Sequence, residues 1–237
     1  MRLGIMQPYF FPYLGYFDLI NSVDHFVIYD SVQYIKHGWI NRNRVLKPGE
    51  GWQYITAPVD RRSFHDSYRT PIKDVEVVQG DAWKERIQGQ LDHYRKRAPR
   101  FQETISLVST CLDSDERSIS RLNASILREI CDALRVAFSY SFASEMPMAH
   151  DAELDAQDRV LAICEWLGAG TYINLPGGRD LYDEQHFRQR GVQIEFRELP
   201  PLVYSCLAYQ FVPNLSIIDV LMWNEPVRIR QHLELNR

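Results

Sequence analysis

The chain has 237 residues and a formal net charge of -4; hydrophobic residues make up 45% of it and charged residues 24%. This length predicts one or two domains with a buried core, and the balance of charge disfavours a nucleic-acid-binding protein, which usually carries a basic excess. No apolar run reaches the roughly 18 residues of a membrane span, and the N-terminus lacks the pattern of a signal peptide. The four cysteines show no CxxC spacing. We therefore expect a cytoplasmic protein with reduced cysteines.

Short apolar runs alternate with longer amphipathic ones along the chain. Strands are predicted at 2–6, 25–29, 53–59, 74–78, 137–142, 171–175 and 192–196. Helices are predicted from about Tyr13 to Ser22, over 83–94, over 119–134 with Asp115 as N-cap, and over 156–167 with Asp155 or its neighbour as N-cap. The alternation predicts an α/β domain over 1–237 with a mostly parallel sheet flanked by helices, and a helical insertion at about 81–135.

The stretch "QPYFFPYLGYF" follows the first predicted strand directly. Its two prolines stiffen the turn, its glycine allows close approach of the backbone, and the N-terminus of the following helix favours an anion. Ligands in open α/β sheets bind outside the carboxyl ends of the strands. We therefore expect one wall of a pocket here, with Gln7, Tyr9, Tyr13, Gly15 and Tyr16 as substrate-binding residues. The alternative is an aromatic staple that packs the first helix onto the sheet.

The chain runs from a strand through a rigid turn into a helix, and then into a second strand that ends in Asp30. This order is similar to the outline of the HIGH-type nucleotidyltransferases and ligases, which have a HUP-like sheet. Tyr13 and Tyr16 stand where that family has two histidines. A tyrosine hydroxyl, with a pKa near ~10, can donate to a phosphoryl oxygen but brings no positive charge. The resemblance implies an ATP-dependent adenylating or nucleotidyl-transferring enzyme.

A polar cluster, "DSVQYIKHGWINRNRV", follows the second predicted strand. Guanidinium and carboxamide groups suit the recognition of phosphates, carboxylates and sugar hydroxyls. The substrate-binding candidates here are Gln33, Lys36, Asn41, Arg42, Asn43 and Arg44. His37 and Asp30 are the catalytic candidates, because either could deprotonate an amine. A solvated surface loop is the alternative interpretation.

A third segment, "NLPGGRDLYD", follows a later strand and could present backbone N–H groups to an anion. It predicts a second pocket wall formed by Asn174, Gly177, Gly178, Arg179 and Tyr182; a tight turn with Asp183 as N-cap explains the glycines equally well. Ser216 and Asp219 match a capping box. Neither HExxH nor another ligand spacing is present, so no metal site is expected, and no Walker, GxGxxG or GxSxG motif identifies a cofactor.

Several of these segments together resemble the WbqC-like proteins of bacteria. They are Gln7-Pro8-Tyr9 with Pro12, Gly15 and Tyr16, then "VIYDSVQYIKHGWINRNRV", "TAPV", "GAGTYINLPGGRDLYDEQHF" and "FVPNLSIIDVL". The resemblance covers nearly the whole chain. It implies a link to O-antigen and other surface-polysaccharide biosynthesis, or to small-molecule biosynthesis.

Three functions follow from these patterns. The first is an enzyme that forms an amide, by acyl or aminoacyl transfer, on an amino group of a nucleotide-linked sugar or similar small molecule. The second is the ATP-dependent enzyme, with Lys36, Arg42 and Arg44 clamping the triphosphate. The third is a non-catalytic small-molecule-binding protein.

Overall fold

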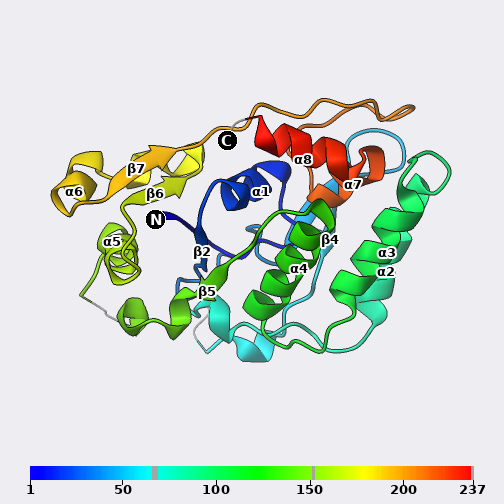
Figure 1. Ribbon diagram of the computed structural model, residues 1–237. Coiled ribbons are helices and arrows are strands. Elements are labelled where there is room, and N and C mark those ends of the chain that lie inside the picture. The colour runs from blue at the N-terminus through cyan, green and yellow to red at the C-terminus, as the bar shows by residue number, and fades with distance from the viewer. Residues whose placement is uncertain (66–68, 151–152, 236–237) are drawn as a thin grey trace.

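The computed structural model describes residues 1–65, 69–150 and 153–235, and its main element is a five-stranded parallel sheet (Figure 1). The strands lie in the order β5 (Tyr140–Phe142), β2 (His25–Ile28), β1 (Arg2–Met6), β6 (Thr171–Asn174) and β7 (Gln193–Phe196). Every neighbouring pair is parallel. β3 (Arg42–Leu46) and β4 (Trp52–Thr56) form a separate antiparallel hairpin. The prediction of an α/β fold with a mostly parallel sheet is confirmed.

Eight α-helices are found in the described parts of the chain. They are α1 (Leu14–Asn21), α2 (Ala82–Leu91), α3 (Phe101–Leu112), α4 (Ile119–Leu134), α5 (Ala156–Trp166), α6 (Glu184–Gln189), α7 (Ile217–Trp223) and α8 (Pro226–Glu234). α2, α3 and α4 occupy the strand-free stretch of 81–135, and Figure 1 shows them grouped away from α5 and α6, which lie beside β6 and β7.

Helices cover both faces of the sheet because the side chains of each strand alternate between two cores. On one face, Leu3 and Ile5 of β1 pack in a cluster with residues of α5 and α6, such as Cys164 and Phe187. On the other face, Phe26 and Ile28 of β2 join a larger cluster with α1, α4 and α7. The sheet is therefore the middle layer of three.

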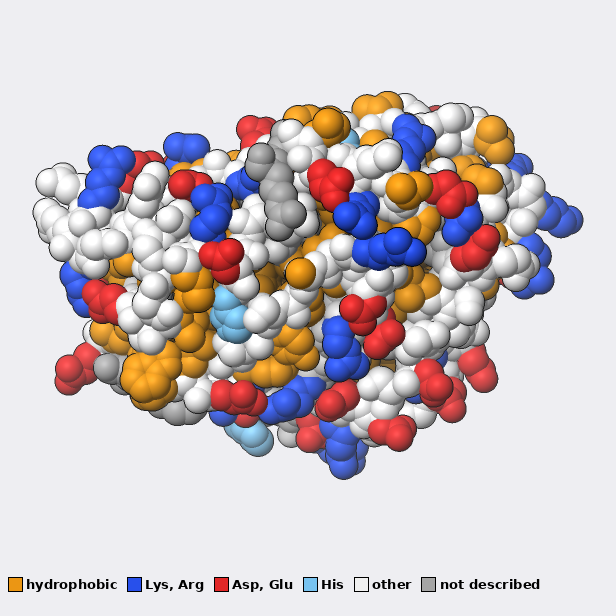
Figure 2. Space-filling model, viewed as in Figure 1, with side chains coloured by type: hydrophobic (Ala, Val, Ile, Leu, Met, Phe, Trp, Pro, Cys, Tyr) orange, Lys and Arg blue, Asp and Glu red, His pale blue; other side chains and the backbone are white. Residues whose placement is uncertain are grey.

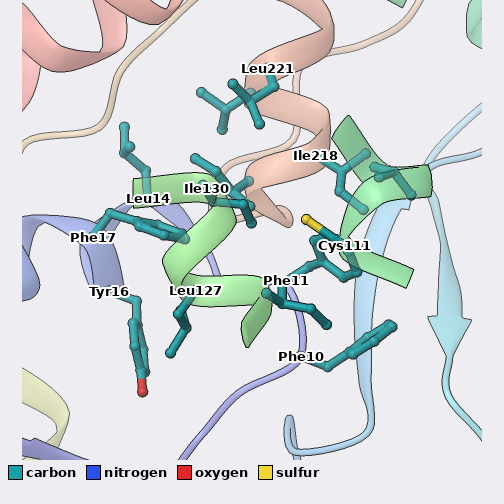
Figure 3. Close-up of a cluster of buried hydrophobic side chains, with 14 of the residues drawn as sticks. Phe10, Phe11, Leu14, Tyr16, Phe17, Cys111, Leu127, Ile130, Ile218 and Leu221 are labelled. Carbon is teal, nitrogen blue, oxygen red and sulfur yellow. The ribbon is translucent and has the colours of Figure 1, made fainter. Parts of the chain in front are cut away.

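The aromatic turn after β1 is part of the larger core. Figure 3 shows Phe10 and Phe11 near side chains of the same buried cluster from α3, α4 and α7, among them Cys111, Leu127 and Ile218. Phe10 and Phe11 are 0% and 1% exposed, and their rings meet edge to face with centroids 4.8 Å apart. The aromatic staple between the first helix and the sheet is formed by Tyr16 of α1, whose ring centre lies 5.6 Å from that of Phe26 of β2.

One predicted strand is wrong, and one observed strand was not predicted. The stretch 74–78 is not a strand: η2, a 3-10 turn, spans Ile72–Asp74, and Val77 then makes only an isolated bridge to Val59. The alternating valines that suggest a strand are explained by burial, since Val75 and Val77 both lie in the core. The polar cluster is not loop throughout, because its last residues form β3.

Only some of the predicted N-cap residues are found at the starts of helices in the structure. Asp155, one of the two predicted caps, caps α5 through its side chain, and Asp183 caps α6, as in the alternative interpretation of a tight turn. α4 starts after Ser118 and not at Asp115. Ser216 accepts the N–H of Ile218 as expected of an N-cap, but Asp219 does not complete a capping box: its carboxylate accepts hydroxyl protons from two tyrosines instead.

The described residues include no helix with both the length and the apolar character needed to cross a membrane. On the face shown in Figure 2, basic and acidic side chains are interspersed and do not form one continuous basic surface.

Candidate functional site

The strand order defines a switch point beside β1. The chain runs from β1 to β2 on one side, whereas β6 pairs with β1 on the other side. The carboxyl ends of β1 and β6 therefore flank the place where open α/β sheets bind their ligands. A cavity of about 810 Å³ lies there, lined by residues of both strand ends; we call it the switch-point cavity. Its volume is within the range of small-molecule sites.

The lining combines aromatic, amide and cationic groups. Its rings are those of Tyr9, Tyr13, Tyr29, Trp39 and Tyr182. Its carboxamides are Gln7, Asn43, Asn174 and Asn214, and its charged side chains are Arg44 and Arg159. Among the described residues, neither a carboxylate nor a histidine lines the cavity. The site is therefore suited to a ligand that has both ring surface and negative charge.

Buried side chains hold the backbone of the aromatic turn in place. The Tyr16 hydroxyl donates to the carbonyl of Gln7 at 2.8 Å, and the Asn123 side chain of α4 donates to the carbonyl of Pro8 at 2.9 Å. Both donors are fully buried. Because a lost bond would leave a buried carbonyl unpaired, these contacts fix the start of the turn.

Asn43 of β3 fixes the middle of the turn. Its Nδ2 group donates to the carbonyls of Phe10 and Phe11, at 3.1 and 2.9 Å. The Ser216 hydroxyl donates to the same Phe11 carbonyl at 2.8 Å. Phe11 has a φ of 42°, which is uncommon for a residue with a side chain, and it persists because its surroundings determine its position.

Arg44 places a cation beside the cavity. Its Cζ lies 5.1 Å from the ring centre of Trp39 and 5.2 Å from that of Trp52. Its Nη2 donates to the carbonyl of Asn214 at 3.3 Å, while its buried Nε has no hydrogen-bond partner. No described carboxylate lines the cavity beside this guanidinium. Its charge is held by aromatic stacking and remains uncompensated by the lining.

Two amides mark the strand ends on either side of the switch point. Gln7 follows β1 directly, and its side chain makes no hydrogen bond to a described residue. Asn174 ends β6, is 5% exposed, and accepts the N–H of Leu175 through Oδ1 at 2.7 Å. That bond fixes the Nδ2 group beside Gly178, where an added Cβ would lie only 2.6 Å from it. Both amides are placed to hydrogen-bond a ligand.

Tyr13 belongs to the wall at the start of α1. Burial, with smaller contributions from Tyr9 and Asp18, raises the pKa of Tyr13 to about 12. Burial also raises the pKa of Tyr29 to about 12, although Arg159 opposes that shift. Both hydroxyls are therefore neutral hydrogen-bond donors at physiological pH. Gly15 leaves space for the Tyr13 ring, because a Cβ on Gly15 would lie 2.5 Å from its Cε2 atom.

The structure brings half of the predicted site residues together at the switch-point cavity. These are Gln7, Tyr9, Tyr13, Asn43, Arg44, Asn174, Gly177, Gly178 and Tyr182. The other predicted residues do not line it; they are Gly15, Tyr16, Asp30, Gln33, Lys36, His37, Asn41, Arg42 and Arg179.

Asp30, one of the two catalytic candidates, is 2% exposed and engaged elsewhere. Its carboxylate accepts the hydroxyl of Ser120 at 3.1 Å and both the N–H and the hydroxyl of Ser144 at 2.9 Å. Burial raises the pKa of Asp30, against these hydrogen bonds. This placement links β2 to α4 and to the segment after β5.

His37, the other catalytic candidate, is exposed in a turn and has a φ of 63°. The Arg42 side chain donates to the carbonyls of His37 and Gly38, and its guanidinium stacks on Tyr54 at 4.1 Å. Asn41 is likewise engaged within the protein: it accepts the Tyr34 hydroxyl and donates to a backbone carbonyl.

Of the remaining residues outside the lining, Gly15 and Tyr16 are buried and the other three lie at the surface. Gln33, Lys36 and Arg179 are exposed, and the guanidinium of Arg179 stacks on Phe196 at 4.6 Å. Tyr16 is fully buried, and Figure 3 shows its hydroxyl directed away from the labelled side chains of α7.

Four polar or aromatic residues of the lining, Tyr29, Trp39, Arg159 and Asn214, were not among the predicted site residues. Tyr29 directly follows β2, so its position at a strand end was a usable signal. Asn214 lies in the "FVPNLSIIDVL" segment, and Trp39 lies in the polar cluster. Arg159, in the first turn of α5, carries no local pattern that distinguishes it from a surface arginine. No group of three or more possible metal ligands is found among the described residues.

Comparisons with known proteins place the chain in a family. The model of the WbqC-like protein family matches residues 7–231. An uncharacterized protein of Mycobacterium tuberculosis, Rv1507c, is 30% identical over 223 residues, covering 93% of this chain and 92% of the relative. No solved structure matches the chain. The match extends over both walls of the switch-point cavity, and the chain belongs to the WbqC-like protein family.

Proposed function

We propose that the chain is a group-transfer enzyme of polysaccharide or related small-molecule biosynthesis, and that it binds a nucleotide-linked sugar in the switch-point cavity. The observation that carries the proposal is Arg44, a cation whose Cζ lies 5.1 and 5.2 Å from the ring centres of two indoles and which lines a cavity without described carboxylates. A guanidinium held in this way suits a diphosphate, and the surrounding rings suit a base or sugar.

The residues divide the recognition of such a ligand among them. Arg44 and Arg159 contact the phosphate oxygens, while Gln7 and Asn174 hydrogen-bond to the hydroxyl groups of the sugar. Tyr13 donates to an oxygen without carrying charge, because its pKa is raised to about 12. The fixed backbone of the turn keeps these groups in position before the ligand arrives, which reduces the entropic cost of binding.

The preferred reaction is amide formation on an amino group of the sugar. The amine nitrogen attacks the carbonyl carbon of an acyl or aminoacyl donor, and the new C–N bond replaces the bond to the leaving group. The leaving group departs with the electron pair and receives the proton that the amine loses. Since the described lining holds neither a histidine nor a carboxylate, the protein contributes by orientation and by stabilising negative charge.

The experiment is a binding titration followed by a transfer assay. A nucleoside-diphosphate-linked amino sugar is expected to bind more tightly than the free amino sugar. Arg44→Gln is expected to weaken its binding about 30-fold, corresponding to about 2 kcal/mol for a lost charged contact. Arg42→Gln is the matched control, because that guanidinium stacks outside the cavity.

The transfer assay adds an acyl donor, and mass spectrometry should then detect the amide. Failure of every nucleotide-linked sugar to bind would overturn the proposal, and binding without turnover would favour the non-catalytic function.

A second candidate is ATP-dependent adenylation or nucleotidyl transfer. Two arginines in a lining that lacks described bases favour it, since an ionised carboxylate substrate needs no deprotonation before it attacks the α-phosphorus of ATP. The oxygen–phosphorus bond then forms as pyrophosphate leaves. ATP should raise the melting temperature, and pyrophosphate should appear only when the carboxylate substrate is present. A melting temperature unchanged by ATP would exclude this candidate.

A further inference from the structure

The chain crosses the surface beside α8 in a segment that has no charged residue. Residues 199–218 include neither Asp, Glu, Lys, Arg nor His, although charged residues make up 24% of the whole chain. Two side chains of α8 fasten this uncharged segment: Nε2 of His232 lies 2.8 Å from the carbonyl oxygen of Pro200, and the Arg228 guanidinium donates to the carbonyl of Val203 at 3.4 Å. Figure 1 shows the segment running past α8 toward α7. Its outer side chains are therefore held on the surface in fixed positions.

A turn within the uncharged segment presents a leucine outward. The carbonyl of Cys206 accepts the N–H of Tyr209 at 3.0 Å, which closes a β-turn over 206–209. Leu207, its second residue, has a φ of 52°, a conformation that favours glycine or asparagine in turns, and its side chain is 70% exposed. Cys206 and Tyr209 on either side are buried. The backbone and the side chain of Leu207 are thus both unfavourable in the isolated protein, and outliers of this kind cluster at functional positions.

Other exposed apolar side chains lie near this turn and along α8. We call them together with the leucine the apolar edge; they are Val203, Leu207, Val227 and Leu235. Arg228, which follows Val227, contacts the carbonyl of Val203, and Leu235 shares a hollow between α8 and the segment with Leu202. Figure 2 shows hydrophobic atoms along the upper edge of the molecule, where Figure 1 places the uncharged segment. The segment and α8 thus expose apolar side chains on one side of the protein.

Basic side chains adjoin the apolar edge at the turn. Arg95, Lys96 and Arg97 are exposed, and Cζ of Arg97 is 4.9 Å from the ring centre of Tyr209. Arg95 pairs with Asp92, whereas Lys96 and Arg97 take part in no ion pair between described residues. Figure 2 shows several Lys and Arg side chains at the right-hand end of the molecule, next to the upper edge. Because the uncharged segment has no carboxylate of its own, the surface beside the turn carries an excess of positive charge.

We propose that the apolar edge and these cations bind the surface of an anionic lipid bilayer. Leu207 and Val203 enter the boundary between the headgroups and the acyl chains, while Lys96 and Arg97 contact the phosphate groups of the lipids. The inference goes beyond the proposed function, since none of these four residues lines the switch-point cavity. The protein attaches to the membrane from one side and does not span it.

The distribution of side chains favours a bilayer over a protein partner. Exposed polar residues, such as Ser205 and Gln210, separate the apolar ones along the segment. The apolar side chains therefore protrude singly, as entry between lipid headgroups requires, and do not form the continuous patch that is typical of a stable protein interface. The lack of carboxylates in 199–218 also avoids repulsion by anionic lipids.

The test is cosedimentation of the full chain with lipid vesicles. Vesicles of phosphatidylglycerol and phosphatidylcholine in equal parts should bind the protein about tenfold more tightly than vesicles of phosphatidylcholine alone, and added salt should weaken that binding. Leu207→Asn should weaken it about tenfold, because an apolar side chain no longer enters the bilayer. Asparagine adopts a positive φ more readily than leucine, so the melting temperature of this variant should not fall. Lys96→Gln should weaken binding about fivefold, as expected for one cation near an anionic surface.

Trp166→Ser is the matched control for the loss of an exposed apolar side chain. Trp166 is 61% exposed at the end of α5, which Figure 1 shows well apart from α8. Its substitution should leave vesicle binding within about twofold of wild type. Binding that weakens in the Leu207 and Lys96 variants and persists in this control supports the inference.

Three results of the vesicle experiment would overturn the inference. They are no binding to the mixed vesicles, equal binding to both kinds of vesicle, and undiminished binding of Leu207→Asn. Light scattering in the absence of vesicles tests the other occupant of this surface. A dimer of the wild-type chain that Leu207→Asn abolishes would make the surface a protein interface, and the inference would then be wrong.

Discussion

The two walls of the switch-point cavity are built in different ways. In the N-terminal wall, side chains of α4, β3 and the α7 start donate to successive backbone carbonyls of the turn over 7–12. The opposite wall is η6 (Pro176–Leu181), where no described side chain donates to a backbone carbonyl and Leu181 is 70% exposed. We infer that the first wall sets the position of the ligand, whereas the second can vary in sequence with little effect on the fold.

Removing the amide of Asn43 tests the rigid wall and should have the largest effect. Asn43→Ala leaves the carbonyls of Phe10 and Phe11 without that donor in a buried environment. The expected loss is about 3 kcal/mol of unfolding free energy, measured by urea denaturation. In the opposite wall, Arg179→Ala should cost less than about 1 kcal/mol, since it removes one exposed cation–π contact. Equal losses in the two variants would refute the contrast.

The charge and the stacking of Arg44 can be separated. Arg44→Lys keeps the cation but loses the planar group that stacks on Trp39 and Trp52. We expect the affinity for a nucleoside-diphosphate-linked sugar to fall about tenfold, which is less than for Arg44→Gln. Calorimetric titration measures this difference. Arg42→Lys, on the same strand but outside the cavity, should leave the affinity within twofold of wild type.

Adjacent glycines offer a matched pair in the opposite wall. A Cβ on Gly178 would lie 2.6 Å from Nδ2 of Asn174, whereas a Cβ on Gly177 would have no neighbour within 4 Å. Gly178→Ala should displace the Asn174 amide and weaken ligand binding about fivefold, while the melting temperature changes little. Gly177→Ala should bind as wild type. Should both variants bind alike, the orientation of Asn174 would have no role in recognition.

The sheet and the position of the cavity could be predicted from the sequence. Both follow from the order of the strands along the chain, which does not change when the boundary of a strand is misplaced by a few residues. Alternating apolar runs identified all five parallel strands, and the rule that ligands bind at strand ends directed attention to Gln7 and Asn174. The roles of the polar cluster were harder to predict. Asn41, Arg42 and Asn43 look like ligand-binding groups in sequence, but each bonds a backbone carbonyl of its own chain.

Long-range contacts decide such roles, and a single sequence does not reveal them. Asn43 meets carbonyls more than 30 positions away, and Asp219 leaves its expected capping role to accept hydroxyl protons from Tyr94 and Tyr204, at 2.6 and 2.7 Å. Arg44 and Arg42 are the same residue type and differ only in their surroundings. Two indole rings and the cavity lie beside Arg44. Local composition predicted that this segment is important, but only the tertiary structure separates ligand-binding residues from those that support the turn.

The smallest expected effect concerns Asp30, which supports the segment behind the rigid wall. Burial raises the pKa of Asp30 above its ordinary value of 3.8. A carboxyl with a raised folded-state pKa contributes stability that is complete below the unfolded pKa and is lost as pH rises through the folded one. The unfolding free energy of wild type should therefore decline, relative to Asp30→Asn, as the pH rises from about 3.8 through that raised pKa.

Asn at this position keeps an acceptor for the N–H of Ser144 and offers its Nδ2 group to the hydroxyls of Ser144 and Ser120. Any difference in these hydrogen bonds shifts the stability of the variant by a constant, and the change with pH isolates the ionisation of Asp30. Urea denaturation of both proteins from pH 3.5 to 8 measures that change. Because Asp30 lies outside the cavity lining, Asp30→Asn should also bind the nucleotide-linked sugar within twofold of wild type. A large loss of turnover with unchanged stability would instead assign Asp30 a catalytic role.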